Sequence, residues 1–416
     1  EDNSIYLFQD HILSDNNSMP WDDFGYKIMF EAFYYKNKET KDLGFLKILI
    51  KDEISTSNYF EQNCEKQDTG VYEITDFMKP NKFVSLGTDI DYYEKLNTLF
   101  INNSRIVLNL LCDASFNQIK LNTYTTWEGF EIAVMRGKSS ESRLKKGYSI
   151  ALGKYSILEN FKISLNDISN FEPIEFFFEN NDFFKKTNIN ILVGSNGTGK
   201  TTILKEIIDI VTGIKEISDK WTYFNKLIVV SFSPFESFYT TNQLEKKLYE
   251  QNAKKTNYSK KKQLKSIDRY AQKTNYSYIG FRNERNKFDL NLPKRNILKS
   301  IIKIINYDNE NDWWLSKSRL DILLETLCLA IRFDYIKLYK KDGTFISLLS
   351  NETKKYSSEQ ILQNKISLKN LVKKQLDSNK EIEFHLNDEK IDLSSGQLIY
   401  SYMLPAIVSE IENESL

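Results

Sequence analysis

The stretch Gly194-Ser-Asn-Gly-Thr-Gly-Lys-Thr-Thr202 decides how the rest of the chain is interpreted. It fits the phosphate-binding P-loop pattern, in which a glycine and four further residues precede glycine, lysine and a hydroxyl residue. The run before it, Asn188–Val193, is apolar and rich in β-branched residues, which predicts a short buried strand. After it, apolar residues recur at helical spacing from Ile203 to Val211, which predicts a helix. The sequence therefore predicts the strand–loop–helix context of a P-loop.

The residue types of this loop suit a nucleotide and a metal ion. Gly194, Gly197 and Gly199 allow the backbone angles of a tight loop. The N–H groups of such a loop and of the following helix start can bind phosphate oxygens. We expect Lys200 to reach the β- and γ-phosphates of ATP, and the Thr201 hydroxyl to ligate Mg²⁺. A glycine-rich turn with a chance lysine is the alternative, but the complete pattern and both flanks agree with a P-loop.

A second motif, Leu393-Ser-Ser-Gly-Gln397, lies near the end of the chain. The apolar residues from Leu398 to Ile407 lie on one face of a predicted helix. Ser394 or Ser395 can cap that helix, and Gly396 lets a ligand approach its backbone. The motif resembles the signature of ATP-binding-cassette (ABC) ATPases, usually Leu-Ser-Gly-Gly-Gln, with Ser395 replacing the first glycine as in SMC-like and OLD-like branches. Alone it would suit an ordinary capped helix, but a P-loop upstream favours the signature.

The resemblance to ABC ATPases implies a fold, a mechanism and a set of site residues. The fold would be α/β, an ABC-ATPase nucleotide-binding domain with a P-loop sheet, an antiparallel β subdomain and a helical insertion. In this family the signature serine of one subunit contacts the γ-phosphate held by the P-loop of another. Lys200 and Ser394 would therefore be the catalytic residues, shared across a homodimer or higher homo-oligomer. The residues expected to bind ATP and Mg²⁺ are Gly194, Ser195, Asn196, Gly197, Thr198, Gly199, Lys200, Thr201, Thr202, Leu393, Ser394, Ser395, Gly396 and Gln397.

The order of motifs in the family also requires a Walker B strand, with an Asp and a catalytic Glu, shortly after the signature helix. The sequence instead stops at Glu412–Leu416, where that strand should begin, and it starts at Glu1 rather than at a methionine. We therefore expect a fragment, in which the catalytic Glu, the D-loop and the switch His are not assigned. We expect such a fragment to bind ATP but to hydrolyse it poorly.

The sequence predicts two domains. An N-terminal α+β accessory module covers residues 1–146, and an ABC-type ATPase domain covers 147–416, with a helical and basic insertion at about 240–380. The boundary is placed in the polar run 138–147. The predicted strands are Lys27–Tyr35, Gly44–Ile50, Tyr148–Leu152, Asn160–Leu165, Ile174–Phe178 and Lys226–Phe232. The predicted helices are Asp91–Phe100, Ile297–Ile305 and Leu320–Ile331, and Arg105–Leu111 is predicted as helix or strand.

The amino-acid composition excludes several classes of protein. The 57 basic and 57 acidic residues balance, so no overall field recruits nucleic acid. Cys64, Cys112 and Cys328 are far apart and form neither a disulfide framework nor a metal pattern, which fits a reducing cytoplasm. No stretch approaches the roughly 18 uninterrupted apolar residues of a transmembrane helix, so no membrane partner is expected.

The segment Lys254–Lys273 is strongly basic, with eight basic residues, one acidic residue and two tyrosines. Basic charge with interleaved aromatic rings can bind nucleic acid, although a solvated insertion explains the same composition. Gln243 is the nearest glutamine that could serve as the Q-loop residue of ABC proteins, which contacts Mg²⁺ and the attacking water.

Three functions follow from the resemblance. The first is an ATPase whose ATP-driven dimerisation controls an effector, similar to the OLD-like and Septu-like ATPases of bacterial antiphage defence, which work with a fused or partner nuclease. The second is an SMC-like DNA-repair ATPase that clamps DNA directly. The third, an ATPase subunit of a transporter, is disfavoured by the N-terminal module and by the wide interval between the two motifs. That interval contains no sustained heptads, so a long coiled-coil arm is not expected.

Overall fold

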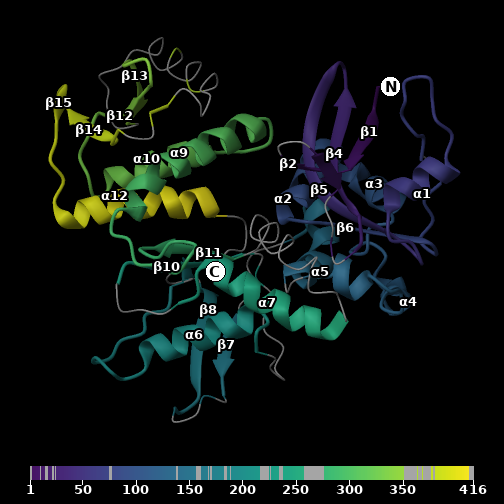
Figure 1. Ribbon diagram of the computed structural model, residues 1–416, viewed down its shortest axis with the longest axis horizontal. Helices are drawn as coiled ribbons and strands as arrows, with labels where there is room; N and C mark the ends of the chain where they lie inside the picture. The colour runs from purple at the N-terminus through teal and green to yellow at the C-terminus, as the bar shows by residue number, and fades with distance from the viewer. Residues whose placement is uncertain are drawn as a thin grey trace. The chain divides into compact units, whose positions relative to one another are not determined.

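The structure is a computed structural model of the chain (Figure 1). It describes residues 2–9, 11–14, 17–20, 23, 25–74, 77–136, 139–155, 161–166, 168, 171–181, 185–187, 189–215, 224, 226–233, 238–256, 276–350, 363, 368, 376–377 and 380–411. The chain divides into two compact units, each described by itself. Unit 1 is Glu1–Leu227, Leu244–Tyr276 and Glu412–Leu416, and unit 2 is Ile228–Gln243 and Ser277–Ile411. The predicted boundary near residue 146 therefore falls within unit 1.

The N-terminal part of unit 1 is built on a four-stranded antiparallel sheet in the order β1-β4-β5-β6. The strands are β1 (Ser4–Gln9), β4 (Met29–Lys36), β5 (Glu39–Ile50) and β6 (Phe83–Gly87). A separate hairpin pairs β2 (His11–Ser14) with β3 (Asn17–Pro20). The helices are α1 (Thr56–Asn63), α2 (Ile90–Phe100), α3 (Ser104–Leu110), α4 (Leu121–Tyr124) and α5 (Ser139–Ala151), with a π-helix at Phe130–Val134.

Local sequence signals explain these elements. In β4 the side chains of Phe30, Ala32 and Tyr34 are buried at alternate positions, as expected for a strand with one face on the core. Helix α2 begins after Asp89, whose carboxylate accepts a hydrogen bond from the Tyr92 N–H at 2.8 Å. The strands predicted at Lys27–Tyr35 and Gly44–Ile50 and the helix predicted at Asp91–Phe100 are confirmed. The ambiguous segment Arg105–Leu111 is largely helical, as α3.

The strand predicted for Tyr148–Leu152 is wrong, because helix α5 runs from Ser139 to Ala151. The polar run predicted as the domain boundary is helical from Ser139 onward for the same reason. Helix α5 packs closely on α2, and Gly147 permits this approach. A Cβ at Gly147 would lie 2.6 Å from Cζ of Tyr93 on α2. Tertiary packing against α2 thus overrides the strand preference of Tyr148 and Ile150.

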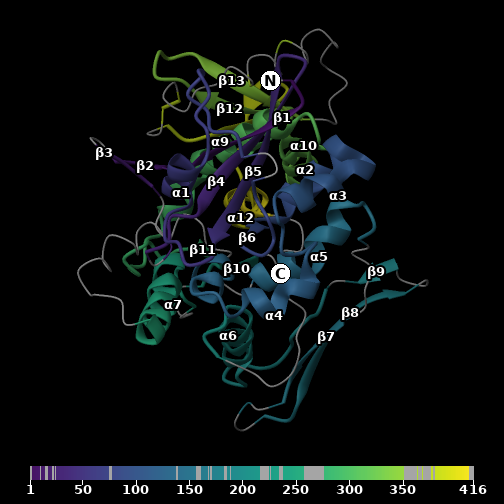
Figure 2. The same cartoon turned by 90° about the vertical axis from the view of Figure 1, so that its right-hand side faces the viewer.

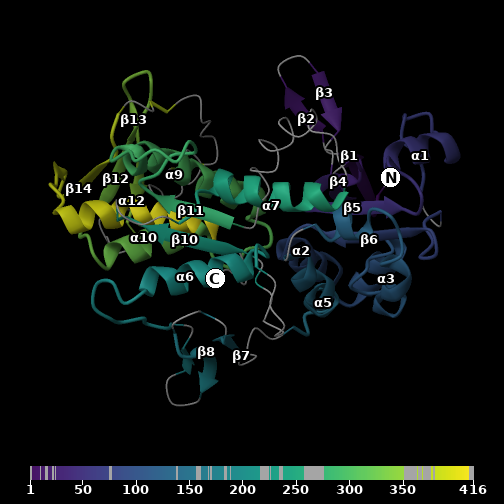
Figure 3. The ribbon, with the colours of Figure 1, turned by 60° about the horizontal axis from the view of Figure 1, so that its bottom comes forward.

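The second part of unit 1 contains β7 (Phe161–Leu165), β8 (Ile174–Asn181), β9 (Lys185–Thr187) and helix α6 (Lys200–Val211). The three strands form an antiparallel sheet in the order β7-β8-β9, which Figure 2 shows as an extended hairpin. Ile163 and Leu165 of β7 are buried in one cluster with Ile203 and Ile210 of α6, and Figure 3 shows α6 beside this hairpin. The predicted strands Asn160–Leu165 and Ile174–Phe178 and the helix after the P-loop are confirmed.

Unit 2 contains a helical layer and a second four-stranded sheet (Figure 1). The helices are α9 (Leu292–Asn311), α10 (Arg319–Cys328) and α12 (Ser395–Glu410), which pack on one another. The antiparallel sheet has the order β13-β12-β14-β15, with β12 (Tyr335–Tyr339), β13 (Phe345–Leu349), β14 (Glu383–Leu386) and β15 (Glu389–Lys390). A two-stranded sheet pairs β10 (Leu227–Ser231) with β11 (Tyr276–Gly280). Helix α7 (Thr241–Thr256) belongs to unit 1 from Leu244 onward. The predicted helices Ile297–Ile305 and Leu320–Ile331 and the strand Lys226–Phe232 are confirmed.

The described chain is therefore a mixed α/β protein with several separate sheets, which confirms the fold class at that level. Among the described residues, no helix has both the length and the apolar character needed to cross a membrane.

Candidate nucleotide-binding site

The loop Gly194–Thr202 has the backbone shape that its glycines predict. Gly197 and Gly199 have φ angles of +85° and +89°, in the left-handed region where side chains other than glycine are strained. Helix α6 begins directly after them, at Lys200. The Lys200 ammonium donates hydrogen bonds to the carbonyl oxygens of Gly194 (2.7 Å) and Ser195 (2.8 Å). The lysine thus lies over its own loop, and the N–H groups of the helix start remain available for an anion.

Phe171 fixes this loop, and the sequence analysis missed it. A Cβ at Gly199 would lie only 2.2 Å from Cζ of the Phe171 ring, so the ring packs directly on the glycine. Gly199 is therefore required twice, for its left-handed backbone and for this contact. A phenylalanine in the connection between β7 and β8 carries no motif, so only the folded chain reveals its role.

The buried strand predicted before the loop is wrong for the described residues 189–193, which form no strand. Ile189, Ile191 and Val193 are 81%, 81% and 84% exposed. The segment is held at Asn190, whose side chain accepts from the Phe177 N–H (3.0 Å) and donates to the Phe177 carbonyl (2.7 Å). An apolar extended segment becomes a buried strand only when its backbone pairs with neighbouring strands, whereas among the described residues only the Asn190 side chain bonds to β8 here.

The second motif forms the N-terminus of α12. Ser394 is the N-cap, and its hydroxyl accepts from the Gln397 N–H at 3.4 Å. The Gln397 side chain accepts from the Ser394 N–H (3.1 Å), which completes a capping box. The same side chain donates to the carbonyl of Ala330 (2.9 Å), after α10. The cap is therefore Ser394 rather than Ser395.

Neither backbone angle nor packing requires a glycine at position 396. Its φ is not positive, and a Cβ at this position would meet nothing within 4 Å. A glycine within a helix destabilises it by about 1 kcal/mol relative to alanine. The open space beside Gly396, in the exposed first turn of α12, would let a ligand approach the backbone closely.

The predicted site residues thus form two groups, one in each compact unit. The group from Gly194 to Thr202 belongs to unit 1, and the group from Leu393 to Gln397 belongs to unit 2. Both groups end in the first turn of a helix, at α6 and α12.

Gln243, the predicted Q-loop residue, has a local structural partner. Its side-chain oxygen accepts from the Thr240 N–H at 3.0 Å, and its own N–H donates to the Thr240 hydroxyl at 3.4 Å. This is a capping box at the start of α7, so the glutamine pattern alone does not indicate a catalytic role. Of the basic segment Lys254–Lys273, residues 257–273 lie outside the described residues.

Thr201 remains the candidate Mg²⁺ ligand. It is the second residue of α6, in the same helix turn as Lys200. Groups of three or more His, Cys, Asp or Glu suited to a metal ion are absent from the part of the chain that the structure describes. A nucleotide-bound Mg²⁺ needs no such group, because phosphate oxygens, water and one or two protein ligands hold it.

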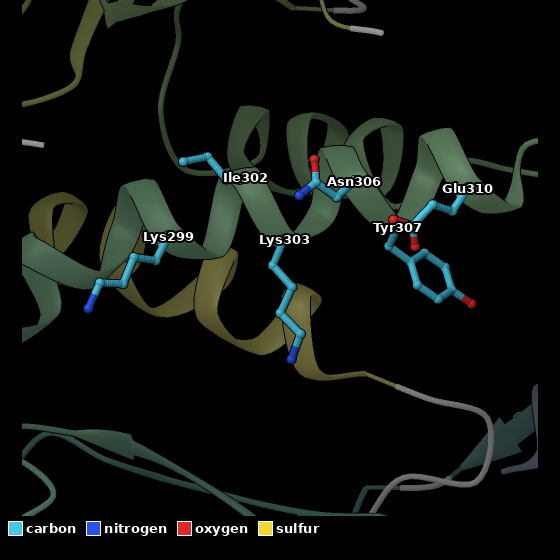
Figure 4. Close-up of a pocket in the computed structure, with 6 residues that line it drawn as sticks. All are labelled: Lys299, Ile302, Lys303, Asn306, Tyr307 and Glu310. Atoms are coloured by element: carbon cyan, nitrogen blue, oxygen red, sulfur yellow. The ribbon is translucent and has the colours of Figure 1, made fainter. Parts of the chain in front are cut away.

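A pocket of about 340 Å³ lies along one face of α9 (Figure 4). Its lining residues are Lys299, Ile302, Lys303, Asn306, Tyr307 and Glu310. Lys303 forms an ion pair with Glu410 at 2.6 Å, in the last turn of α12 and so at the opposite end of that helix from Ser394. The pocket is therefore not part of the second motif, and we assign it no ligand.

One strongly perturbed acid lies in the N-terminal part of unit 1. Asp113 is fully buried, and burial raises the pKa of its carboxyl group to about 6. It accepts hydrogen bonds from the hydroxyls of Ser115 and Tyr93, and Tyr93 in turn accepts from the Gly87 N–H. This network links β6 and α2 to the segment around Asp113, so we assign the acid a structural role.

Comparison with known proteins gives one partial likeness. The chain is 26% identical to Protein ea59 of Escherichia phage lambda over 238 residues, which are 52% of this chain and 43% of the phage protein. The chain thus spans less than half the length of that relative. No protein-family model matches the chain, and no solved structure matches it.

Proposed function

We propose that the chain is an ABC-type ATPase subunit that binds ATP and Mg²⁺ at Gly194–Thr202. The left-handed glycines, the helix start at Lys200 and the position of its ammonium support this assignment. Bound ATP would displace the ammonium from the carbonyl oxygens of Gly194 and Ser195 toward the β- and γ-phosphates. Thr201 would then contribute one oxygen to the Mg²⁺ shell.

We propose further that Leu393–Gln397 completes the ATP site of a second copy of the chain. The observation that carries this step is Gly396, whose missing side chain neither backbone angle nor packing requires. A γ-phosphate docking on the first turn of α12 would explain the glycine, since helix N-termini bind anions and a Cβ would crowd the approach. The resulting head-to-tail homodimer has one two-fold axis and two equal sites.

The output of this dimer is proposed from the family resemblance alone. ATP-dependent closure would control an effector, a nuclease that is either a partner protein or a fused domain, in bacterial antiphage defence. The finer fold, an ABC nucleotide-binding domain with an N-terminal accessory module, rests on the same resemblance.

A mixed-subunit experiment tests the shared site without requiring hydrolysis. Chains carrying Lys200→Ala and Ser394→Arg are labelled with different fluorophores, and energy transfer is measured with Mg²⁺ and a non-hydrolysable ATP analogue. Neither variant should form a closed homodimer. Their heterodimer keeps one intact site, made of Lys200 from the Ser394→Arg chain and Ser394 from the Lys200→Ala chain, and should close partially. Closure of Ser394→Arg alone, or a wild type that stays monomeric with the analogue, contradicts the shared site.

A further inference from the structure

The sheet of unit 2 has two chemically different faces. One face packs into the helical core through Ile336, Leu338 and Ile346. The opposite face carries the alternate residues of each strand, as the strand period requires. On that face Tyr339 of β12 lies directly across from Phe345 of β13. Figures 1 and 3 show the sheet on one side of the helices of this unit.

Two lysines and two aromatic rings meet at one corner of that face. The Lys337 ammonium lies 4.4 Å from the Phe345 ring centroid and 5.9 Å from the Tyr339 centroid. The Lys380 ammonium lies 4.7 Å from the Tyr339 centroid. The Phe345 side chain sits at the surface, 49% exposed. We call these four residues the aromatic–lysine corner.

The two ammonium groups of the corner have no carboxylate partner among the described residues. Glu383 of β14, which pairs with Lys337 across the sheet, is already engaged, because it accepts hydrogen bonds from Tyr339 (2.7 Å) and Lys390 (2.9 Å). Burial alone would raise the pKa of Glu383, yet these bonds and one from His385 lower it to about 2. Glu383 thus stays ionised and is held by its own hydrogen-bond donors, and it forms no ion pair with Lys337 or Lys380.

The geometry points to the aromatic–lysine corner as a binding site for single-stranded nucleic acid. An unpaired nucleotide offers a flat base and an anionic phosphate, which match the exposed ring of Phe345 and the adjacent ammonium groups. Duplex DNA hides its base faces, so it could use only the two charges. A purely structural corner would need neither the exposed ring nor two cations without a carboxylate partner. This assignment is independent of the proposed ATP site and of Lys254–Lys273.

Fluorescence anisotropy with a labelled 20-residue oligo-dT and a matching duplex provides the test. Phe345→Ala should weaken binding of the single strand about tenfold and leave duplex binding nearly unchanged. Lys337→Gln with Lys380→Gln should lower the slope of log K against log salt by about 1.4, as expected for two phosphate contacts. Affinity and salt dependence are measured for these variants in the wild-type chain and in a Lys260→Gln, Lys261→Gln, Lys262→Gln background. The second background separates binding by the corner from binding by the basic segment Lys254–Lys273.

Matched variants control for general effects. Phe288→Ala removes an equally exposed ring of unit 2, at 46% exposure. Lys82→Gln removes an ammonium that lies 4.4 Å from the Tyr59 centroid in unit 1. Neither should change affinity. If Phe345→Ala perturbs folding, as judged by circular dichroism, Phe345→Leu replaces it.

Photo-crosslinking with 5-iodouracil in the oligonucleotide gives a second readout, because stacked rings react selectively. The expected product is on Phe345 or Tyr339. Crosslinks elsewhere, equal affinity for single strand and duplex, or unchanged binding by the corner variants overturns the proposal. Absence of binding at low salt overturns it as well.

Discussion

The two motifs use glycine for different reasons. In the loop of unit 1, Gly199 has a left-handed backbone, and a Cβ there would meet the ring of Phe171. At the start of α12, Gly396 has neither constraint. The fold therefore requires the first glycine, whereas the second has no such requirement and, in the function proposed above, serves the phosphate that docks on α12. This difference teaches that a glycine without a structural reason is a better indicator of a ligand than one that the backbone demands.

The largest effect is expected for Lys200→Ala, which removes the charged contact to the phosphates. The loss should be about 3 kcal/mol in ATP affinity, or about 100-fold. Isothermal titration with ATP, with and without Mg²⁺, measures it. The control is Lys162→Ala, which removes a lysine of β7 that pairs with Glu175 on the adjacent strand. Equal affinities of Lys200→Ala and wild type would show that the loop is a structural turn.

Gly199→Ala should destabilise the region around α6 by about 2 kcal/mol, because it combines a strained φ with a clash against Phe171. Hydrogen exchange of the α6 amides reports this local loss. Gly70→Ala is the matched control, since Gly70 has a φ of +84° but a Cβ there would meet nothing within 4 Å. In the control, hydrogen exchange of the amides around Gly70 should report the cost of the strained φ alone. If both variants lose the same stability, the Phe171 contact contributes nothing.

The parts of this picture that were predictable from sequence depend on local signals. The glycines of the P-loop, the start of α6 and the cap at Ser394 follow from residue types within a few positions of each other. The failures depend on distant partners. Residues 189–193 have a strand composition but no backbone pairing with a strand in the described chain, and the segment from Tyr148 to Ala151 is helical and packs on α2.

The contacts that the sequence did not reveal also join residues that lie far apart in the chain. Phe171 reaches Gly199 only through the fold of the β7–β8 connection. The aromatic–lysine corner joins Lys337, Phe345 and Lys380, which no local pattern connects. Gln243 shows the opposite case, because its position suggested catalysis whereas its contacts form a helix cap.

A smaller effect is expected for Gln397→Ala, which tests whether the second motif has a structural component. The variant loses the bonds to Ser394 and to the Ala330 carbonyl. The expected loss is about 1.5 kcal/mol in the stability of the first turns of α12. Hydrogen exchange of the α12 amides measures it. Gln397→Glu keeps the bond to the Ser394 N–H but cannot donate to Ala330, so it should lose about half as much. Unchanged protection of the α12 amides in Gln397→Ala would show that the capping box does not stabilise this helix.

Gly396→Ala should change the stability of the fold least, and it should raise that stability, whereas Gly199→Ala and Gln397→Ala lower it. Alanine is the better helix former and its Cβ meets nothing within 4 Å, so α12 should gain about 0.5–1 kcal/mol. Hydrogen exchange of α12 should therefore slow in the isolated chain. In the presence of Mg²⁺ and a non-hydrolysable ATP analogue, however, the same methyl group should crowd the approaching phosphate and weaken dimer closure, measured by light scattering. ATP affinity of the single chain should not change, because the P-loop is untouched.

A variant that is both more stable and fully competent in closure would show that nothing docks at Gly396. A variant that loses stability would show that the fold requires this glycine as it requires Gly199, and the contrast between the two motifs would disappear.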